Sequence, residues 1–455
     1  MAPTDVSEPP SGRGEAYAWY VVSVLMLTFA VAYIDRQILS LLVEPLKRDL
    51  GVSDTQIGLL AGLAFAAFYT VLGVPIARLS DRGNRVRIIS AGVAVWSLMT
   101  AICGLASSYS TLFLARIGVG AGEATVGPAS YSIIADYFPP ERVARAVGVY
   151  IMGVYLGVGL AMIGGSAVVR WTSTAEVFAI PVIGDVRAWQ LAFLLAALPG
   201  VLALALLATV REPARRQYLE DGSSREIVAR RSEWHEVATF LRTHRALFGA
   251  WTFGSAAAGT VITAFFVWVP ELLRRSHGMG IADAGLLFGI LLVACGAPGS
   301  SSAGWAVGRL RLRGHRDAEV RAALYCCVLI LPLGIAAAVA PSAALATLAL
   351  APLLFLMGMA QALTPAVVQL ISPNHLRAQL TALFTLVAVL IGATAGPTVV
   401  AMIADFVFRD EKRLGTSLAI VVAALMPIAI ALYRTALRPF VAARTPPPPA
   451  ELRTP

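Results

Sequence analysis

Twelve apolar segments, each about as long as a helix that crosses a bilayer, follow one another along this chain. Roughly 20 apolar residues in a helix span the hydrocarbon layer of a membrane. Hydrophobic residues form 58% of the sequence and charged residues only 14%, which is more apolar than a soluble core requires. We therefore predict an all-α integral membrane protein with twelve transmembrane helices. The segments are residues 19–43, 56–78, 87–106, 110–137, 143–169, 189–210, 246–272, 281–308, 320–340, 342–371, 377–405 and 415–437.

A long polar stretch from Arg211 to Arg245 divides the twelve segments into two sets of six. Its second part, Arg225 to Arg245, mixes apolar and charged residues. This mixture predicts either an amphipathic helix on the membrane face or a solvated linker helix. We expect two pseudo-symmetric six-helix bundles joined by this linker. The predicted regions are a flexible N-terminus (1–17), a first bundle (18–210), a linker (211–245), a second bundle (246–438) and a disordered proline-rich tail (439–455).

The basic residues are distributed unevenly between the two sides of the membrane. If both termini lie on one side, that side carries 25 of the 36 Lys and Arg residues and the opposite side carries 9, while Arg36 and Arg116 lie within apolar segments. Short cytoplasmic loops are enriched in Lys and Arg. We therefore expect cytoplasmic termini, and a location in the inner membrane if the chain is bacterial. Because orientation accounts for the net charge of +9, no nucleic-acid partner is expected.

The sequence lacks the motifs of common enzyme and metal sites. His235-Glu236 is followed by Val237, Ala238 and Thr239, so the HExxH zinc motif fails, and no phosphate-binding GxxxxGK loop is present. The four cysteines lie within apolar segments and do not have the spacing of a zinc site. We expect a protein that is not an enzyme and that needs no cofactor or metal.

Four ionisable residues inside the apolar segments are the strongest indication of a functional site: Asp35, Arg36, Arg116 and Glu123. Each such group costs roughly 2.5–3.5 kcal/mol at membrane depth, so it must be paired or must face water. Arg116 and Glu123 are two helical turns apart and share one helix face, about 10 Å apart along the axis. The alternative interpretation is a buried ion-pair network that only fixes helix packing.

Three short motifs resemble those of a known transporter family. Asp81-Arg82-Gly83-Asn84-Arg85 is similar to the signature loop of the major facilitator superfamily. Together with this loop, Tyr33-Ile34-Asp35-Arg36 and the stretch from Arg116 to Ala124 resemble the spinster branch, whose members transport lysolipids and sphingoid phosphates. The resemblance implies alternating access, in which two helix bundles rock around a central site. It also implies that helices 1, 4, 7 and 10 line the cavity, where the four buried charges would converge.

The resemblance implies a gate at the signature loop, made of Asp81, Arg82 and Arg85. In the family, the acid of this loop contacts the start of helix 11, here about Asn374 to Arg377, and holds the cytoplasmic side closed. The physical basis is that a helix N-terminus attracts negative charge. The alternative is that the arginines only orient the loop.

We hypothesise a secondary transporter, proton-linked, that moves an amphiphilic anion such as a lysophospholipid or a sphingoid phosphate. Glu123 is the first choice for the coupling group and Asp35 the second, with an arginine meeting the head group. The alternatives are a drug or small-metabolite exporter of the same superfamily, or a non-transporting channel or sensor. The expected partners are protons, a lysolipid-like substrate and the bilayer, and the expected state is a monomer. The expected apolar cavity wall contains Phe253, Thr260, Phe265, Trp268, Met359 and Gln361.

Overall fold

The structure is a computed structural model, and it describes residues 12–64, 71–73, 75–76, 79–80, 83–138, 140–172, 177–180, 184–214, 216–218, 224–226, 234–373 and 376–444. Among these residues, ten helices are long and apolar enough to cross a membrane. The all-α prediction is confirmed, with two short hairpins outside the spans. The first half contains α1 (Gly12–Gln37), α2 (Val43–Leu50), α3 (Asp54–Ala61), α5 (Arg85–Gly104), α6 (Tyr109–Glu123), α7 (Val126–Tyr137), α8 (Pro140–Thr172) and α9 (Ala188–Leu207).

The second half, residues 234–444, begins with a short helix and continues with long ones. It contains α10 (Trp234–Thr243), α11 (Arg245–His277), α12 (Ile281–Leu291), α13 (Ala297–Leu312), α14 (Ala318–Ala338), α15 (Ala343–Ile371), α16 (Arg377–Met402) and α17 (Leu414–Arg444). Within this half α11 packs against α16 and α17, and α14 packs against α15 and α17. In the first half α1 packs against α8, and α5 against α6 and α9. The two halves meet where α8 contacts α12 and where α3 contacts α16.

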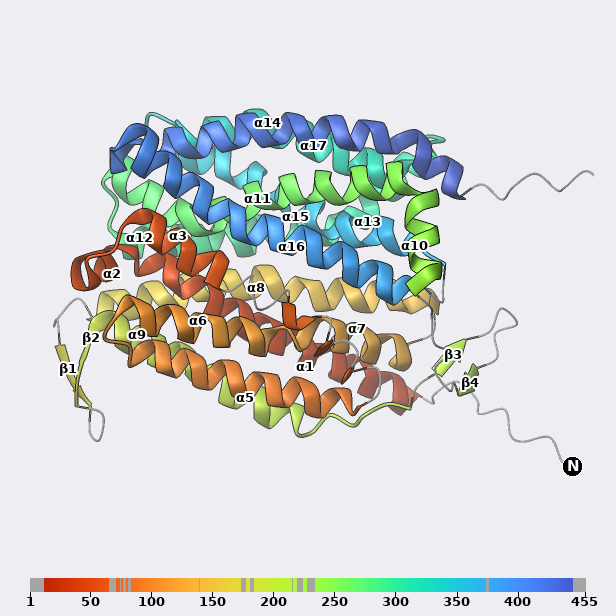
Figure 1. The fold of residues 1–455 in the computed structure, drawn as a ribbon, viewed down its shortest axis with the longest axis horizontal. Helices are drawn as coiled ribbons and strands as arrows, with labels where there is room; N and C mark the ends of the chain where they lie inside the picture. The colour runs from red at the N-terminus through yellow and green to blue at the C-terminus, as the bar shows by residue number, and fades with distance from the viewer. Residues whose placement is uncertain are drawn as a thin grey trace, which may run out of the picture.

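The long helices lie roughly side by side, and the two ends of the molecule differ (Figure 1). At one end, which we call the α2 end, lie α2 and the hairpin of β1 (Val177–Ile180) and β2 (Gly184–Arg187). At the other, the α10 end, lie α10, the start of α1 and the end of α17. The first and last described helices therefore begin and end on the same side of the molecule.

Two of the twelve predicted segments are not among the ten long spans. The segment 56–78 runs partly through residues outside the described part, although α3 and the described residues of 71–80 are helical. The segment 110–137 is two helices, because the chain turns at Ala124 and Thr125 between α6 and α7. At this turn the carbonyl oxygen of Gly122 accepts from both the backbone nitrogen and the hydroxyl of Thr125, at 3.3 and 2.9 Å.

The linker differs from the single amphipathic helix that the sequence suggested for Arg225 to Arg245. Arg225 belongs to a strand, β4 (Ser224–Glu226), which pairs with β3 (Arg216–Tyr218). The helix α10 begins only at Trp234, and residues 227–233 lie outside the described part. Val237 is 2% exposed, and Phe240 and Leu241 pack against the same apolar cluster. The apolar face of α10 therefore packs against the protein.

Glycine allows α8 to lie directly against α1. A Cβ built at Gly157 would lie 2.4 Å from the carbonyl oxygen of Ala30 and 2.8 Å from the Cβ of Tyr33. Side-chain atoms do not approach backbone that closely, so a residue without a Cβ is required at this contact. The contact fixes the part of α1 that carries Tyr33 and the buried charges after it.

We expect Gly157→Ala to lower the free energy of unfolding by about 1–3 kcal/mol, because the added methyl group pushes α8 away from α1. Thermal unfolding of the purified protein measures the effect. Gly164→Ala is the matched control on the same helix, since a Cβ there would meet nothing within 4 Å. Equal unfolding temperatures for the two variants would show that the α1 and α8 backbones are not in close contact.

Candidate functional site

Arg36 and Glu123 form an ion pair that joins α1 to α6. Nη2 of Arg36 donates to Oε2 of Glu123, and Cζ of Arg36 lies 4.5 Å from the centroid of the Tyr33 ring. The side chain of Glu123 is 1% exposed and that of Arg36 is 17% exposed. The carboxylate is therefore enclosed, whereas the Arg36 side chain is partly exposed.

Asp35 and Arg116 lie beside this pair and are also buried. The hydroxyl of Thr100, on α5, donates to Oδ2 of Asp35 at 2.7 Å. Nη1 of Arg116 donates to the backbone carbonyl oxygen of Asp35 at 3.2 Å. The structure thus brings Asp35, Arg36, Arg116 and Glu123 together, and we call these four residues the central charge cluster.

Several atoms of the central charge cluster lack a hydrogen-bond partner within the described part of the chain. They are Oδ1 of Asp35, Oε1 of Glu123, and Nε and Nη2 of Arg116. Leaving a buried polar group unpaired costs about 1–3 kcal/mol, and more when the group is charged. Two unused guanidinium donors in particular suit an anion. The cluster is therefore arranged to accept a further polar ligand or a proton.

The positions of Glu123 and Thr100 follow from close packing of α6 on α5. A Cβ at Gly122 would lie 2.8 Å from the backbone nitrogen of Trp96, and one at Gly118 would lie 2.5 Å from the side chain of Met99. Small residues permit such approach between membrane helices. Glu123 is also the last residue of α6, directly before the turn into α7. Irregular backbone at membrane depth is tolerated where it lines a cavity, which agrees with a site at this position.

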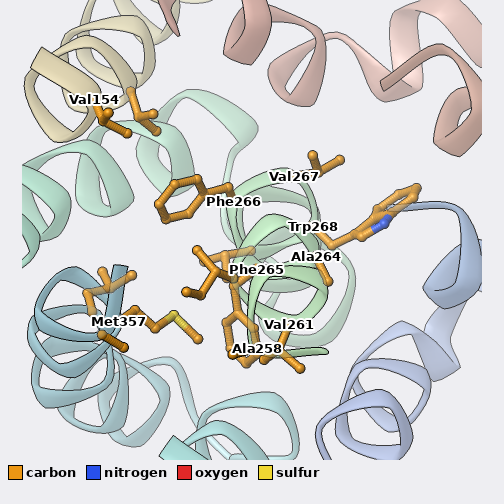
Figure 2. Close-up of a cluster of buried hydrophobic side chains, with 14 of the residues drawn as sticks. Val154, Ala258, Val261, Ala264, Phe265, Phe266, Val267, Trp268 and Met357 are labelled. Carbon is orange, nitrogen blue, oxygen red and sulfur yellow. The ribbon is translucent and has the colours of Figure 1, made fainter. Parts of the chain in front are cut away.

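The second half meets the first near the middle of the molecule. The hydroxyl of Tyr155, on α8, donates to Oε1 of Gln361, on α15, at 2.8 Å. The Tyr155 ring also meets Phe266, on α11, edge to face, with centroids 6.0 Å apart. Figure 2 shows that Phe266 and Trp268 point to different sides of α11 and that Val154 lies on the side of Phe266.

Gln361 and Met359, which were expected on the cavity wall, are partly buried on α15. Phe265 packs within the second half, next to Gly334 on α14: a Cβ built on Gly334 would lie 3.7 Å from Cζ of Phe265. Trp268 donates from Nε1 to the carbonyl oxygen of Pro397 at 2.9 Å and so faces α16. Phe266 follows Phe265 in the sequence, and in this conformation its ring contacts Tyr155 of the first half.

The other two residues of the expected wall lie on α11. Thr260 is 2% exposed and donates to the carbonyl oxygen of Ala256 at 2.8 Å, so its hydroxyl is used within its own helix. Phe253 is 54% exposed. Its ring is not enclosed by neighbouring helices.

The gating loop is described only in part. Asp81 and Arg82 lie outside the described residues, as do Asn374 and His375 before α16. Arg85 is buried and binds Asp136 on α7 through Nη1. Its Nε donates to Oε1 of Glu212 at 2.6 Å. Arg85 therefore ties the start of α5 to two other parts of the first half.

A second group of charges crosses between the halves at the α2 end. Arg275, on α11, contacts Oδ2 of Asp54 on α3 at 2.5 Å and Oε1 of Glu44 on α2 at 3.2 Å. It also binds Glu271 on its own helix, and Lys47 binds both Asp54 and Glu411. We call these six residues the α2-end ion network. Asp54 and Glu271 are completely buried, so the network closes this end of the molecule.

Electrostatics within the α2-end ion network keep its charges in place. Burial raises the pKa of Asp54, but hydrogen bonds and charge from Arg275 and Lys47 outweigh it and hold the pKa below its usual value. Burial lowers the pKa of Lys47, whereas hydrogen bonds to Glu411 and Asp54 raise it above its usual value. Both groups are therefore charged at neutral pH.

Two further contacts near the α2 end also join the halves. The backbone nitrogen and hydroxyl of Thr55 donate to Oδ2 of Asp405 at 2.7 and 2.6 Å, and Arg170 binds Asp283.

The sequence did not reveal these contacts. Thr100 and Tyr155 lie in largely apolar helices that hold other polar residues such as Ser97 and Tyr150, so the sequence does not single them out. Arg275 lies among charged residues at a helix end. Asp54 directly follows the helix-capping residue Ser53, and of its two partners Lys47 lies nearby in sequence whereas Arg275 lies 221 residues away.

Comparisons with known proteins agree with this geometry. The family model of the Major Facilitator Superfamily matches residues 25–397. An MFS-type efflux pump of Mycolicibacterium smegmatis is 30% identical, over 92% of this chain and 93% of that protein. Protein spinster homolog 1 of Xenopus tropicalis is 31% identical over 58% of this chain. The match covers only 48% of that relative, so the chain spans about half its length.

Solved structures also resemble the chain. A bacterial homolog of the human lysosomal transporter spinster, in an inward-facing and unoccupied conformation, has a TM-score of 0.70 and 26% identity, covering 94% of this chain and 97% of that one. The predicted resemblance to the spinster branch is thus confirmed. Ten apolar spans, buried charges between helices and a family match along most of the sequence have one common explanation: the chain is a multi-pass membrane transporter that belongs to the Major Facilitator Superfamily.

Proposed function

We propose that the chain is a proton-linked transporter of an amphiphilic anion with a phosphate head group, such as a lysophospholipid or a sphingoid phosphate. The observation that carries this proposal is the central charge cluster, in which Arg116 keeps unused donors and Arg36 is partly open. A guanidinium binds phosphate through paired hydrogen bonds. Tyr155 and Phe266, which are buried where the two halves meet, supply aromatic side chains for contact with the chain of such a molecule.

Proton coupling follows from competition for Arg36. In this structure Arg36 binds Glu123, and a proton on Glu123 would remove the charge that holds the guanidinium. Arg36 would then be released to the phosphate of the substrate. Asp35 accepts its hydrogen bond from a neutral hydroxyl, that of Thr100, so its protonation frees no arginine. This difference favours Glu123 over Asp35 as the coupling group.

A second candidate function is export of drugs or small metabolites. The relative in Mycolicibacterium smegmatis is named an efflux pump and covers nearly the whole chain, which favours this alternative. A hydrophobic cation would pair with the carboxylates of Asp35 and Glu123 rather than with the arginines. The two functions therefore differ in which charge of the central charge cluster holds the ligand.

The substrate prediction concerns Arg36. We expect Arg36→Ala to weaken lysolipid binding about tenfold or more, because a hydrogen-bonded charge contributes roughly 1.5–3 kcal/mol. Arg36→Lys should not restore it. Shortening the acyl chain by two CH₂ groups should weaken binding about 15-fold, at roughly 0.8 kcal/mol each. Titration of purified protein with lysolipids of different length measures both effects.

Arg48→Ala is the matched control for Arg36→Ala, since Arg48 lies on the surface at the α2 end with 63% of its side chain exposed. It should bind lysolipids like the unchanged protein. Binding of hydrophobic cations without any dependence on acyl length would contradict the proposal and support the exporter.

The coupling prediction concerns Glu123. We expect Glu123→Gln to abolish uphill, pH-driven flux while exchange of substrate across the membrane continues. Glutamine keeps the shape of the side chain, but it cannot take up and release a proton. Flux into proteoliposomes with an imposed pH gradient measures this. Asp185→Asn, in the exposed β2 strand, is the control and should keep the full pH dependence. Uphill flux by Glu123→Gln with the usual pH dependence would assign coupling to another residue.

The third prediction concerns alternating access and the α2-end ion network. We expect Arg275→Gln to open this end, because removing one partner of a buried ion pair typically costs about 3–5 kcal/mol. A cysteine at Thr55, labelled with a membrane-impermeant maleimide in a Cys295→Ser background, should react faster in this variant. Arg275→Lys should restore part of the slow labelling. Unchanged labelling would mean that apolar packing, and not the network, closes the end.

A further inference from the structure

A surface hollow at the end of α13 combines cationic and apolar side chains. Its volume is about 530 Å³, and it is lined by Trp305, Gly308, Arg309, Arg311 and Leu312. Two of these five residues are arginines, and none is acidic. The hollow lies on a different half from the central charge cluster of α1 and α6.

The hollow lies where a membrane-spanning helix leaves the bilayer. The span from Ile281 to Leu312 is apolar and ends with these residues. In Figure 1, α13 runs toward the α10 end, the end that the distribution of basic residues assigns to the cytoplasm. Trp305 is 68% exposed and Leu312 is 90% exposed. Tryptophan at this depth is typical of side chains that sit among lipid head groups.

The two arginines of the hollow are held in place by neighbours. Cζ of Arg309 lies 5.8 Å from the centroid of the Trp305 ring, and Arg311 binds Glu319 on α14. Stacking on an aromatic ring leaves the edge of a guanidinium available for hydrogen bonds. More arginines follow in the same short stretch, at positions 313, 316 and 321, against two acids, Asp317 and Glu319. Clusters of arginine next to a membrane helix attract anionic lipids.

We propose that this hollow binds the phosphate head group of an anionic bilayer phospholipid, such as phosphatidylglycerol, as a bound lipid and not as transported substrate. Arg309 and Arg311 contact the phosphate, and Trp305 contacts the upper part of the acyl chains. The charge of the lining residues and their place at the end of a span select this occupant. Gly308 is one of the lining residues, and a Cβ there would meet nothing within 4 Å.

Native mass spectrometry of the purified full-length protein, titrated with phosphatidylglycerol or phosphatidylcholine, tests the proposal. We expect one tightly bound phosphatidylglycerol and a much weaker affinity for phosphatidylcholine. Arg309→Gln should weaken phosphatidylglycerol binding about fivefold, the typical contribution of one arginine at a membrane surface. Gly308→Leu should weaken it as well, because the added side chain takes up space in the hollow, where its Cβ meets no neighbour within 4 Å.

Arg438→Gln is the matched control, since Arg438 is an exposed arginine near the α10 end of α17, and it should leave binding unchanged. Arg36→Ala should also leave it unchanged, which separates this site from the central charge cluster. The unfolding temperature of each variant reports whether it is folded.

Three results would overturn the proposal. They are full phosphatidylglycerol affinity in folded Arg309→Gln and Gly308→Leu, equal affinity for the two lipids, and loss of the bound lipid in Arg36→Ala alone. Displacement of the lipid by millimolar inorganic phosphate would identify a site for free anions instead, and would equally exclude a bilayer lipid as its occupant.

Discussion

The burial of four charged side chains among apolar helices is the constraint on which the arrangement of the first half depends. A charge at this depth is tolerated only when another polar group faces it. Arg36 on α1 must therefore reach Glu123 on α6, and Arg116 must reach the backbone of α1 at Asp35. Since these partners belong to separate helices, the pairing fixes how α1 lies against α6. Glycines on α6 allow this helix to pack closely on α5, and Gly157 on α8 allows close packing on α1, so backbone contacts hold the helices that carry these side chains.

The two charged regions of the protein differ in how completely their charged atoms are paired, and this difference suits different tasks. In the α2-end ion network, Arg275 meets four carboxylates, and Asp54 is held by both Arg275 and Lys47. Such a saturated network stabilises one arrangement of the halves. The central charge cluster instead keeps unpaired atoms on Asp35, Glu123 and Arg116 within the described part. A transporter needs both properties, because one end must stay closed while the site between the halves remains able to bind.

The spans and the central charge cluster were predictable from the sequence because both depend on local properties. An apolar run of sufficient length and a charge inside it are visible without knowledge of neighbours. The break between α6 and α7 was missed because glycine and alanine around it permit either a straight or a bent helix. The α2-end ion network was missed because Asp54 and Arg275 are far apart in sequence, and charges at helix ends pair with whichever loop the fold brings near. Phe265 and Phe266 differ by about 100° around a helix, so composition alone did not decide which ring faces the first half.

Because the two halves contribute different side chains, a bound ligand can change the conformation of the protein. The first half supplies the charges of the central charge cluster. The second half supplies Phe266 and Gln361, both of which contact Tyr155 of the first half. A ligand shifts a conformational equilibrium only by its difference in affinity for the two states. An amphiphile whose head binds Arg36 and whose chain binds α11 and α15 contacts both halves at once. Its affinity therefore depends on their separation, whereas a ligand held by the first half alone would bind every conformation equally and drive no transport.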